Sequence, residues 1–404
     1  MISIEEALTI ISRHELPMVT ESVKLSEALD RVITDDIMAP EPLPRYTNSA
    51  MDGFAVLWND VKAGSEDAPP SLSVVGESRA GEPYHDTVHT GETVRISTGA
   101  MLPDGADSVI PMEDVDDSGE TISIRSVTGK NQHIRFEGEE IRTGDTVLES
   151  GVRLTPSSLG LMASLGVRNV MVSIPPAVGI VVTGHELAEA GDVIEPWQVR
   201  DSNALMLDAA IVKAGGRVTC MSRCGDQLEE TETAILRAAE LSQIVIVSGG
   251  VSVGPHDLVK QAAGNAGFEE LFWRVRQKPG KPMFFARRED TLLFGLPGNP
   301  VAVLNCFAYY IHPLLQRMLG RPFRWETLSG TIDAPYENST NRSFFLRVAV
   351  SREDNGPVTI TPLGMQGSHM LSSMTDADGF LLIDQGHALK AGDEVVVHLY
   401  PWRA

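Results

Sequence analysis

The chain has 404 residues, which at about 150 residues per domain predicts two to four domains. Hydrophobic residues make up 42% and charged residues 22% of the sequence, a globular composition that excludes a wholly disordered chain. Acidic residues outnumber basic ones by 55 to 33, which gives a net charge of −22. We therefore expect no nucleic acid and no anionic membrane surface among its partners, because the overall field repels both.

The sequence does not indicate a membrane or secreted protein. The most apolar stretch, 170–184, is shorter than the ~20 residues that a bilayer span needs, and Pro175 and Pro176 interrupt it. Glu5 and Glu6 stand where a signal peptide would carry basic residues. Three cysteines are too few for a disulfide-held fold of this length. We expect a cytoplasmic protein with reduced thiols.

The first 175 residues predict a helical region interrupted by a β-rich one. Ser3 and Glu6 have the spacing of a helix capping box, and a second short helix is expected over 25–32. Three prolines within 39–46 end this helical region. From 47 to 133, short β-branched runs alternate with Gly, Pro and Asp, which predicts strands and turns. Another capped helix follows, so the β-rich part is expected to be an insertion in a discontinuous first domain.

The residues from 176 to 320 have the pattern of an α/β domain. Apolar runs of sequence AVGIVV, IVIVS and TLLFG alternate with helical periodicity over 202–214, 228–241 and 300–319. Buried strands between helices predict a parallel-rich sheet covered on both faces, in three layers. Each run leads into a polar or glycine-rich turn, and ligands of open α/β sheets bind at the carboxyl ends of the strands. These turns therefore predict one binding rim.

The chain from 323 onward is β-rich again. Two apolar runs, 344–350 and 358–362, flank the turn Asp354-Asn355-Gly356 and predict a hairpin. The predicted fold class is therefore α/β and β multi-domain. The expected domains are a discontinuous helical linker domain (1–44 and 134–175), an inserted β-rich domain (45–133), a three-layer α/β domain (176–322) and a β-barrel-like C-terminal domain (323–404).

Two motifs at the predicted rim are suited to anions. SGGVSVG, at 248–254, follows a buried strand, and its glycines and amides favour close approach of an oxyanion, although such a turn also serves tight strand–helix packing. The stretch 273–288 holds six basic residues and no acid, and a Pro-Gly pair places Lys278 and Lys281 on one rigid turn. In so acidic a protein, we interpret this turn as an oxyanion clamp rather than only an exposed basic strand.

A helix start and several acids complete the predicted site. Asn299 and Pro300, in LPGNP, have the character of an N-cap and a first helical residue, and a helix N-terminus favours anions. Glu186, Asp226 and Asp257 follow predicted strands or start helices, where single acids usually serve as caps. Three acids beside a phosphate-type turn instead predict Mg²⁺, which takes one or two carboxylates with phosphate oxygens and water.

Other reactive motifs lack the residues that they need. Cys220-x₃-Cys224 has no second ligand pair nearby, so we expect ordinary thiols rather than a zinc site. His85 and His89 lie in a predicted loop, not on one helical face. The chain has neither a dinucleotide-binding GxGxxG nor a P-loop, which argues against these two classes of function.

Seven motifs occur in one order along the chain: MDGFA, RISTGAMLPDGAD, TGHEL, RDSN, SGGVSVG, KPGKP and LPGNP. The whole chain thereby resembles the MoeA family of molybdopterin molybdenumtransferases, to which the gephyrin E domain of animals is related. The resemblance implies a molybdopterin-binding α/β domain and a homodimer held partly by the linker domain. Its cleft would join the α/β and C-terminal domains of one subunit to the inserted domain of the other. The implied reaction is Mg²⁺-dependent cleavage of adenylylated molybdopterin, with release of AMP and insertion of molybdate.

The resemblance also implies roles for individual residues. Asp52 and Thr98 match functional positions of the inserted domain and would act across the dimer. Asp52, Glu186, Asp226 and Asp257 match catalytic acids, and the last two would hold the metal. The implied substrate-binding residues are Thr98, Ser248, Gly249, Gly250, Ser252, Lys278, Lys281, Pro297, Asn299, Pro300, Arg347 and Ser368.

Three positions depart from the family pattern. His185 stands where many relatives have Asp, Arg274 replaces a Lys of some relatives, and Ala302 replaces a Ser frequent after LPGNPV. Two alternatives stay open: a tungstate-inserting paralogue, because the two oxyanions are nearly isosteric, and a non-catalytic molybdopterin-binding or scaffold protein on the same fold. The expected protein partners are the molybdopterin adenylyltransferase and molybdoenzyme acceptors.

Overall fold

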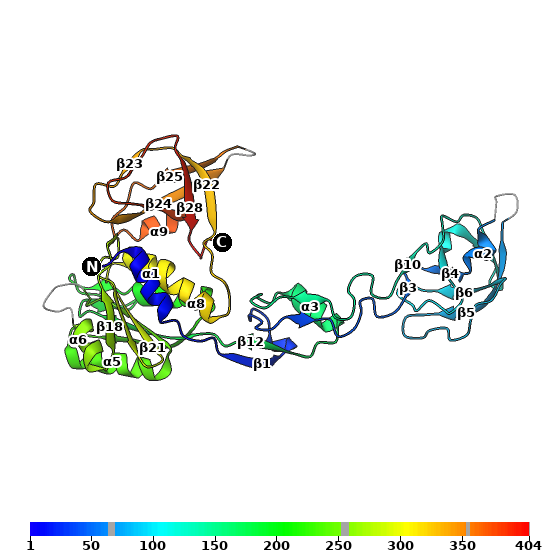
Figure 1. Cartoon of the computed structure of the whole chain (residues 1–404), viewed down its shortest axis with the longest axis horizontal. Helices are drawn as coiled ribbons and strands as arrows, with labels where there is room; N and C mark the ends of the chain where they lie inside the picture. The colour runs from blue at the N-terminus through cyan, green and yellow to red at the C-terminus, as the bar shows by residue number, and fades with distance from the viewer. Residues whose placement is uncertain (64–68, 252–257, 353–355, 404) are drawn as a thin grey trace. The chain divides into compact units, whose positions relative to one another are not determined.

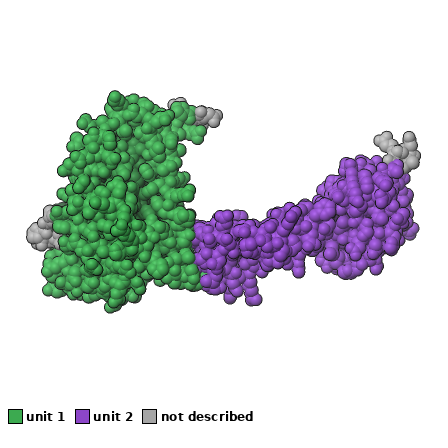
Figure 2. Space-filling view, in the orientation of Figure 1, with its two compact units in different colours: residues 1–21, 173–404 green, residues 22–172 purple. Residues whose placement is uncertain are grey.

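The computed structural model describes residues 1–63, 69–251, 258–352 and 356–403. The chain divides into two compact units, residues 22–172 and residues 1–21 with 173–404 (Figure 2). Two paired strands, β1 (Thr20–Lys24) and β12 (Asn169–Ser173), lie where the chain leaves the larger unit and where it returns. Within the described ranges, no helix combines the length and the hydropathy that crossing a membrane requires.

The larger unit contains a six-stranded sheet with helices on both faces (Figure 1). The strand order is β16 (Arg217–Cys224), β13 (Ala177–Thr183), β17 (Ile244–Ser248), β21 (Thr291–Leu296), β20 (Phe284–Arg288) and β18 (Glu269–Trp273). The first four strands run parallel, and the last two pairings are antiparallel. The predicted parallel-rich sheet is confirmed.

Alternate residues of the central strand β17 face opposite helical layers. Ile244 and Ile246 join the core with α1, α4 and α7, whereas Val245 and Val247 join the core with α5 and α6. Both faces are buried, so the strand is apolar throughout, as a doubly covered sheet requires. The helix bounds are α1 (Ile4–Arg13), α4 (Asn203–Lys213), α5 (Leu228–Leu241), α6 (Val259–Asn265) and α7 (Pro300–Cys306). The three predicted layers are therefore present.

The helix predicted over 300–319 is present but changes its winding in the middle. After α7, the chain forms a π-helical turn, Phe307–Ile311, and then α8, His312–Met318. Pro313 has no amide hydrogen, so the regular bond to the carbonyl four residues earlier cannot form there. A π turn is a common way of accommodating such an interruption.

One half-buried histidine in α8 should make the protein less stable in acid. Burial lowers the pKa of His312 from 6.5 to about 4. Between these values the unfolded chain binds a proton that the folded chain does not, so stability falls as the pH falls. From pH 7 to pH 5 the loss should be about 2 kcal/mol. Urea unfolding of wild type and His312→Phe at both pH values checks this, and an equal pH effect in the two proteins would contradict it.

The C-terminal strands close into a barrel. The order is β19 (Gln277–Lys278), β24 (Ser343–Arg352), β25 (Val358–Pro362), β22 (Thr327–Ile332), β28 (Glu394–Leu399) and β26 (Gly379–Ile383), and β26 pairs again with β24. The predicted hairpin is confirmed by the antiparallel pair β24–β25; Asp354 and Asn355 of its turn lie outside the described residues. Shorter elements are β23 (Tyr336–Glu337), β27 (Ala388–Leu389) and α9 (Ser372–Asp376).

The smaller unit contains a second six-stranded β-sheet. Its order is β7 (Ser108–Pro111), β4 (Gly53–Val56), β6 (Glu92–Ile96), β5 (Ser71–Ser78), β9 (Thr121–Ile124) and β8 (Val115–Asp117). The remaining elements are β2 (Ile37–Met38), β3 (Asn48–Ser49), α2 (Trp58–Val61), β10 (Ile134–Arg135), β11 (Thr146–Leu148) and α3 (Pro156–Ser164). The predicted β-rich character of this part of the chain is confirmed.

The prediction of a short helix over 25–32 is wrong. Only a 3₁₀ turn, Leu25–Glu27, forms there. Asp30 has φ +64°, a left-handed conformation that ends helical winding, and its N–H donates to Leu154. The apolar spacing of this segment instead serves a small core with α3 and β12.

Candidate functional site

A pocket of about 590 Å³ opens at the carboxyl ends of β13 and β21. It lies within the larger unit, and its walls include five predicted site residues: Glu186, Gly250, Pro297, Asn299 and Pro300. The walls also include residues that the sequence did not single out, among them Asn203, Pro282 and His369. The turns after separate strands therefore meet at one rim, as the parallel sheet predicts.

The glycine-rich turn lines this pocket with backbone. Gly249 and Gly250 have φ +99° and +62°, and a Cβ atom at Gly249 would lie 2.7 Å from the Thr183 carbonyl oxygen. Only glycine fits that approach. Ser248 just before them is fully buried. Ser252 and Asp257, also predicted site residues, lie outside the described residues.

Asn203 joins three segments of the rim. Its Nδ2 atom donates to Ser248 Oγ at 2.9 Å and to the Gly298 carbonyl oxygen at 2.8 Å. The first bond reaches the glycine-rich turn and the second reaches LPGNP, while Asn203 itself begins α4. One buried amide thus fixes the spacing of these three segments.

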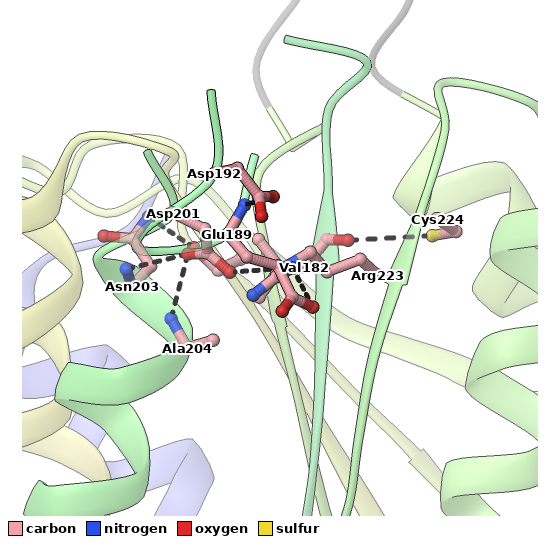
Figure 3. A network of polar contacts seen from close by, with 9 residues as sticks. Val182, Glu189, Asp192, Asp201, Asn203, Ala204, Arg223 and Cys224 are labelled. Atoms are coloured by element: carbon pink, nitrogen blue, oxygen red, sulfur yellow. Dashed lines mark hydrogen bonds and ion pairs between the residues drawn. The ribbon is translucent and has the colours of Figure 1, made fainter. Parts of the chain in front are cut away.

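A buried carboxylate holds Asn203 in place. Asp201 Oδ1 accepts the N–H groups of Asn203 and Ala204, at 2.9 and 3.1 Å, and its Oδ2 accepts Nε of Arg223 at 2.9 Å (Figure 3). Arg223 also pairs with Glu189 at 2.8 Å, and the hydrogen bond to Asp201 is the main cause that raises the pKa of Arg223. The negative charge at the start of α4 also suits the helix dipole.

The turn that carries Lys278 and Lys281, here called the basic turn, is anchored by a buried side chain. Gln277 is fully buried, and its Nε2 donates to the Gly280 carbonyl oxygen at 3.0 Å, while its Oε1 accepts the Tyr310 hydroxyl. Lys278 and Lys281, at either side of the turn, are exposed. Because β19 pairs with β24, the same turn joins the α/β layers to the barrel. The lysines therefore stand on a fixed backbone, next to the pocket residue Pro282.

The two predicted residues of the barrel take different places. Ser368 contacts the rim: its Oγ accepts Asn299 Nδ2 at 2.9 Å, and its carbonyl oxygen accepts the N–H of Val301. Arg347 is 1% exposed and donates through Nη2 to the carbonyl oxygens of Met365 and Gly367. Arg347 thus holds the loop that presents Ser368.

The predicted acids are grouped only in part. Glu186 lines the pocket and is exposed. Asp226 is held by His185, whose Nε2 accepts the Asp226 N–H at 3.1 Å and whose N–H approaches Asp226 Oδ2 at 3.5 Å. Across the described ranges, no three His, Cys, Asp or Glu side chains are grouped so that they would hold a metal ion.

Asp52 and Thr98 form a pair in the smaller unit. The N–H and the hydroxyl of Thr98 donate to Asp52 Oδ1, at 2.6 and 3.0 Å. These bonds lower the pKa of the exposed Asp52 carboxyl, the backbone bond most strongly. Asp52 is therefore a stable, exposed carboxylate.

The other two departures from the family pattern, Arg274 and Ala302, pack against neighbouring parts of the fold. The guanidinium of Arg274 lies 3.8 Å from the ring centre of Trp273, and Ala302 is buried in α7. Asp201 and Asn203, which organise the rim, lie in RDSN; that motif carried the family resemblance but was given no role from the sequence. Its position just before a predicted helix, at the rim, was the available signal.

Three regions of the chain match protein-family descriptions. Residues 2–166 match "MoeA N-terminal region (domain I and II)". Residues 179–317 match "Probable molybdopterin binding domain", and residues 330–400 match "MoeA C-terminal region (domain IV)".

Curated relatives and solved structures are similar over nearly the whole length. Proteins named molybdopterin molybdenumtransferase from Haemophilus influenzae and Bacillus subtilis are 34% and 32% identical, covering 98% and 95% of this chain and 98% and 90% of their own lengths. A structure titled molybdopterin biosynthesis MoeA protein, from Pyrococcus horikoshii, has a TM-score of 0.86 at 30% identity and covers 98% of both chains. A second, from the same organism, has a TM-score of 0.81 at 27% identity and covers 99% of this chain and 100% of its own.

Proposed function

Because this chain belongs to the MoeA family of molybdopterin molybdenumtransferases, we propose that it inserts molybdate into adenylylated molybdopterin with release of AMP. Its place in molybdenum cofactor biosynthesis, as an enzyme, follows from the family. The finer reaction is supported by one arrangement: an anchored basic turn stands next to a pocket whose rim carries an exposed carboxylate and a glycine-rich turn. Such a rim provides charged and backbone donors for an oxyanion and for a phosphoanhydride.

In this proposal, Lys278 and Lys281 bind the anionic groups. Both lysines attract molybdate or phosphate oxygens by charge-assisted hydrogen bonds. Their spacing is fixed, because Gln277 bonds to the backbone of the turn that carries them. Ser248, Gly249, Gly250 and Ser252 would approach the phosphates through the backbone and hydroxyl groups, and Pro297, Asn299, Pro300 and Ser368 would shape the opposite wall. Arg347 supports this wall from the barrel.

We propose that Asp226 and Asp257 hold Mg²⁺ with substrate oxygens and water. The Asp226 carboxylate can supply oxygen ligands to the ion. In the described part of the chain, Asp226 makes two side-chain hydrogen bonds, both with His185, and only one of them uses the carboxylate. Two carboxylates are enough for this ion, because Mg²⁺ is usually bound by one or two carboxylates together with substrate oxygens and water. When bound, Mg²⁺ would neutralise charge that develops on the phosphoanhydride oxygens. Glu186 would orient the substrate from the pocket wall.

We further propose a cytoplasmic homodimer with four domains, divided as the sequence predicts. In that dimer, Asp52 and Thr98 would act on substrate bound by the partner subunit. The Asp52 carboxylate is suited to this role because it is exposed and ionised. The molybdopterin adenylyltransferase would supply the substrate, and molybdoenzymes would receive the product.

The direct test is release of AMP. Purified protein given adenylylated molybdopterin, Mg²⁺ and molybdate should release AMP, as measured by chromatography, and chelation of Mg²⁺ should stop the release. A parallel reaction with tungstate distinguishes the two oxyanions. Intact adenylate under all these conditions would overturn the proposed reaction and favour a binding or scaffold role.

Replacing Lys281 by alanine should weaken molybdate binding. Loss of one charge-assisted contact should raise the molybdate concentration for half-maximal AMP release about tenfold. Lys390→Ala, which removes an exposed lysine of the barrel, is the matched control and should change nothing. Equal behaviour of the two variants would place the oxyanion elsewhere.

Replacing Asp226 by asparagine should weaken Mg²⁺ use. The neutral amide attracts the ion less, so the Mg²⁺ concentration for half-maximal AMP release should rise about tenfold. Asp290→Asn is the control, since that side chain is 95% exposed and lies outside the pocket walls. An unchanged Mg²⁺ dependence in Asp226→Asn would remove this residue from the metal site.

A further inference from the structure

Two loops meet where the neighbouring strands β13 and β16 end. Thr183, the last residue of β13, pairs with Cys224, the last residue of β16. The N–H of Gly184 then donates to the Cys224 carbonyl oxygen at 3.2 Å. Because the two strands run parallel, the residues that follow them, His185 in one loop and Asp226 in the other, come together at the rim of the sheet.

His185 and Asp226 contact each other twice. The Nε2 atom of His185 accepts the Asp226 N–H at 3.1 Å, and the His185 N–H approaches Asp226 Oδ2 at 3.5 Å. An imidazole nitrogen that accepts an N–H carries no proton, so the neutral ring has its hydrogen on Nδ1. Neither ring nitrogen of His185 therefore offers a free lone pair to a metal ion. The ring is suited to support Asp226 rather than to act as a ligand itself.

Glycine at position 225 makes room for this contact. A Cβ atom at Gly225 would lie 2.8 Å from His185 Nδ1 and closer still to Cε1. These distances are too short for packed atoms, so a larger residue at 225 would displace the ring. The imidazole thus packs directly against the backbone that leads into Asp226.

We propose that His185 is a positioning residue: its ring fixes the backbone of Asp226 and so holds the Asp226 carboxylate in place for a divalent cation. This inference rests on the proposed role of Asp226 in Mg²⁺ binding. Within the described ranges, one hydrogen bond uses the Asp226 carboxylate, which keeps its other oxygen lone pairs for the cation. Groups that orient a metal ligand in this way commonly contribute roughly 10- to 100-fold to metal affinity.

Binding of Mn²⁺ to the full-length protein in the presence of AMP tests the proposal without turnover, with the free ion measured by electron paramagnetic resonance. His185→Leu, which removes the acceptor, should weaken Mn²⁺ binding about tenfold. His185→Gln should restore the affinity to within about threefold, because its amide oxygen can take the place of Nε2. Since His185 is exposed, the melting temperature of both variants should stay within about 3 °C of wild type. His387→Leu, the matched control, removes an exposed histidine of the C-terminal domain and should change nothing.

A second variant leaves His185 itself in place. Gly225→Ala should push the ring away from the Asp226 N–H and weaken Mn²⁺ binding as much as His185→Leu does. Gly160→Ala is its control, since a Cβ atom at Gly160 meets no neighbouring segment within 4 Å.

The outcomes distinguish this inference from the proposed reaction. Wild-type Mn²⁺ affinity in His185→Leu, with weakened binding in Asp226→Asn, would overturn the positioning role alone. Equal weakening in His185→Leu and His185→Gln would also overturn it, because the acceptor would then not matter. Unchanged binding in Asp226→Asn, or no Mn²⁺ binding by wild type, would overturn both the metal role and this inference. No AMP release by wild type, together with Mn²⁺ binding that depends on His185, would reject the reaction alone.

Discussion

Replacing Gln277 by leucine should lower the free energy of unfolding by about 3 kcal/mol and nearly abolish AMP release at low molybdate. Leucine fills the space but leaves the Gly280 carbonyl and the Tyr310 hydroxyl, both buried around this side chain, without partners. Each buried group without a partner costs about 1–3 kcal/mol. The turn that carries Lys278 and Lys281 would lose its anchor, so both lysines would lose their fixed spacing.

Urea unfolding and the molybdate dependence of AMP release measure these two effects. Gln227→Leu is the matched control, since Gln227 is exposed before α5 and should leave both quantities within about 0.5 kcal/mol and twofold. Tyr310→Phe should give an intermediate loss of stability, because only one bond is removed. A Gln277→Leu protein with wild-type molybdate dependence would show that the turn keeps its geometry without this amide.

Replacing Asp201 by asparagine should also cost about 3 kcal/mol and reduce AMP release by two orders of magnitude. The Asp201 side chain is 1% exposed and accepts three hydrogen bonds, one of them from Arg223. An NH₂ group in place of one oxygen points a donor at another donor and leaves the arginine without its buried partner. Asn203 would lose the bond that holds it, and with it the joined segments of the rim.

A second acid on the same arginine provides the control. Glu189 pairs with Arg223 at 2.8 Å, but its side chain is 70% exposed, so Glu189→Gln should cost less than 1 kcal/mol. Chemical denaturation and initial rates of AMP release compare the two variants directly. Similar losses in both would mean that burial of Asp201 has no special importance.

The sequence predicted those parts of the fold whose signals are local. The run Ile244–Ser248 is apolar at every position, and this pattern correctly placed a strand between two helical layers. Ser3 and Glu6 predicted the start of α1, and the structure has both capping bonds. The helix predicted over 25–32 from local spacing does not form, because long-range hydrogen bonds determine the backbone there. The N–H of Asp30, for example, donates to the carbonyl oxygen of Leu154.

The sequence indicated which motifs belong to the site, but not which of their residues bond to one another. LPGNP and the glycine-rich turn indicated their own places at strand ends, and the structure brings both to one pocket. The bond from Arg223 to Asp201 and the bonds from Asn203 to Ser248 and Gly298 join distant positions, and no spacing rule signals such pairs. The closing pair of the barrel, β24 with β26, is also a long-range contact.

The division of the chain into a continuous and a discontinuous unit has a consequence for its synthesis. Residues 22–172 leave the ribosome as one uninterrupted block with all of their own core partners. Helix α1 emerges earlier, yet apolar side chains that share its core, such as Met283 and Phe307, are made more than 250 residues later. During translation, the block should fold first, while the amphipathic first helix waits with its apolar side exposed. Chaperone capture of nascent chains should therefore concentrate on that helix until the last third of the protein has been made.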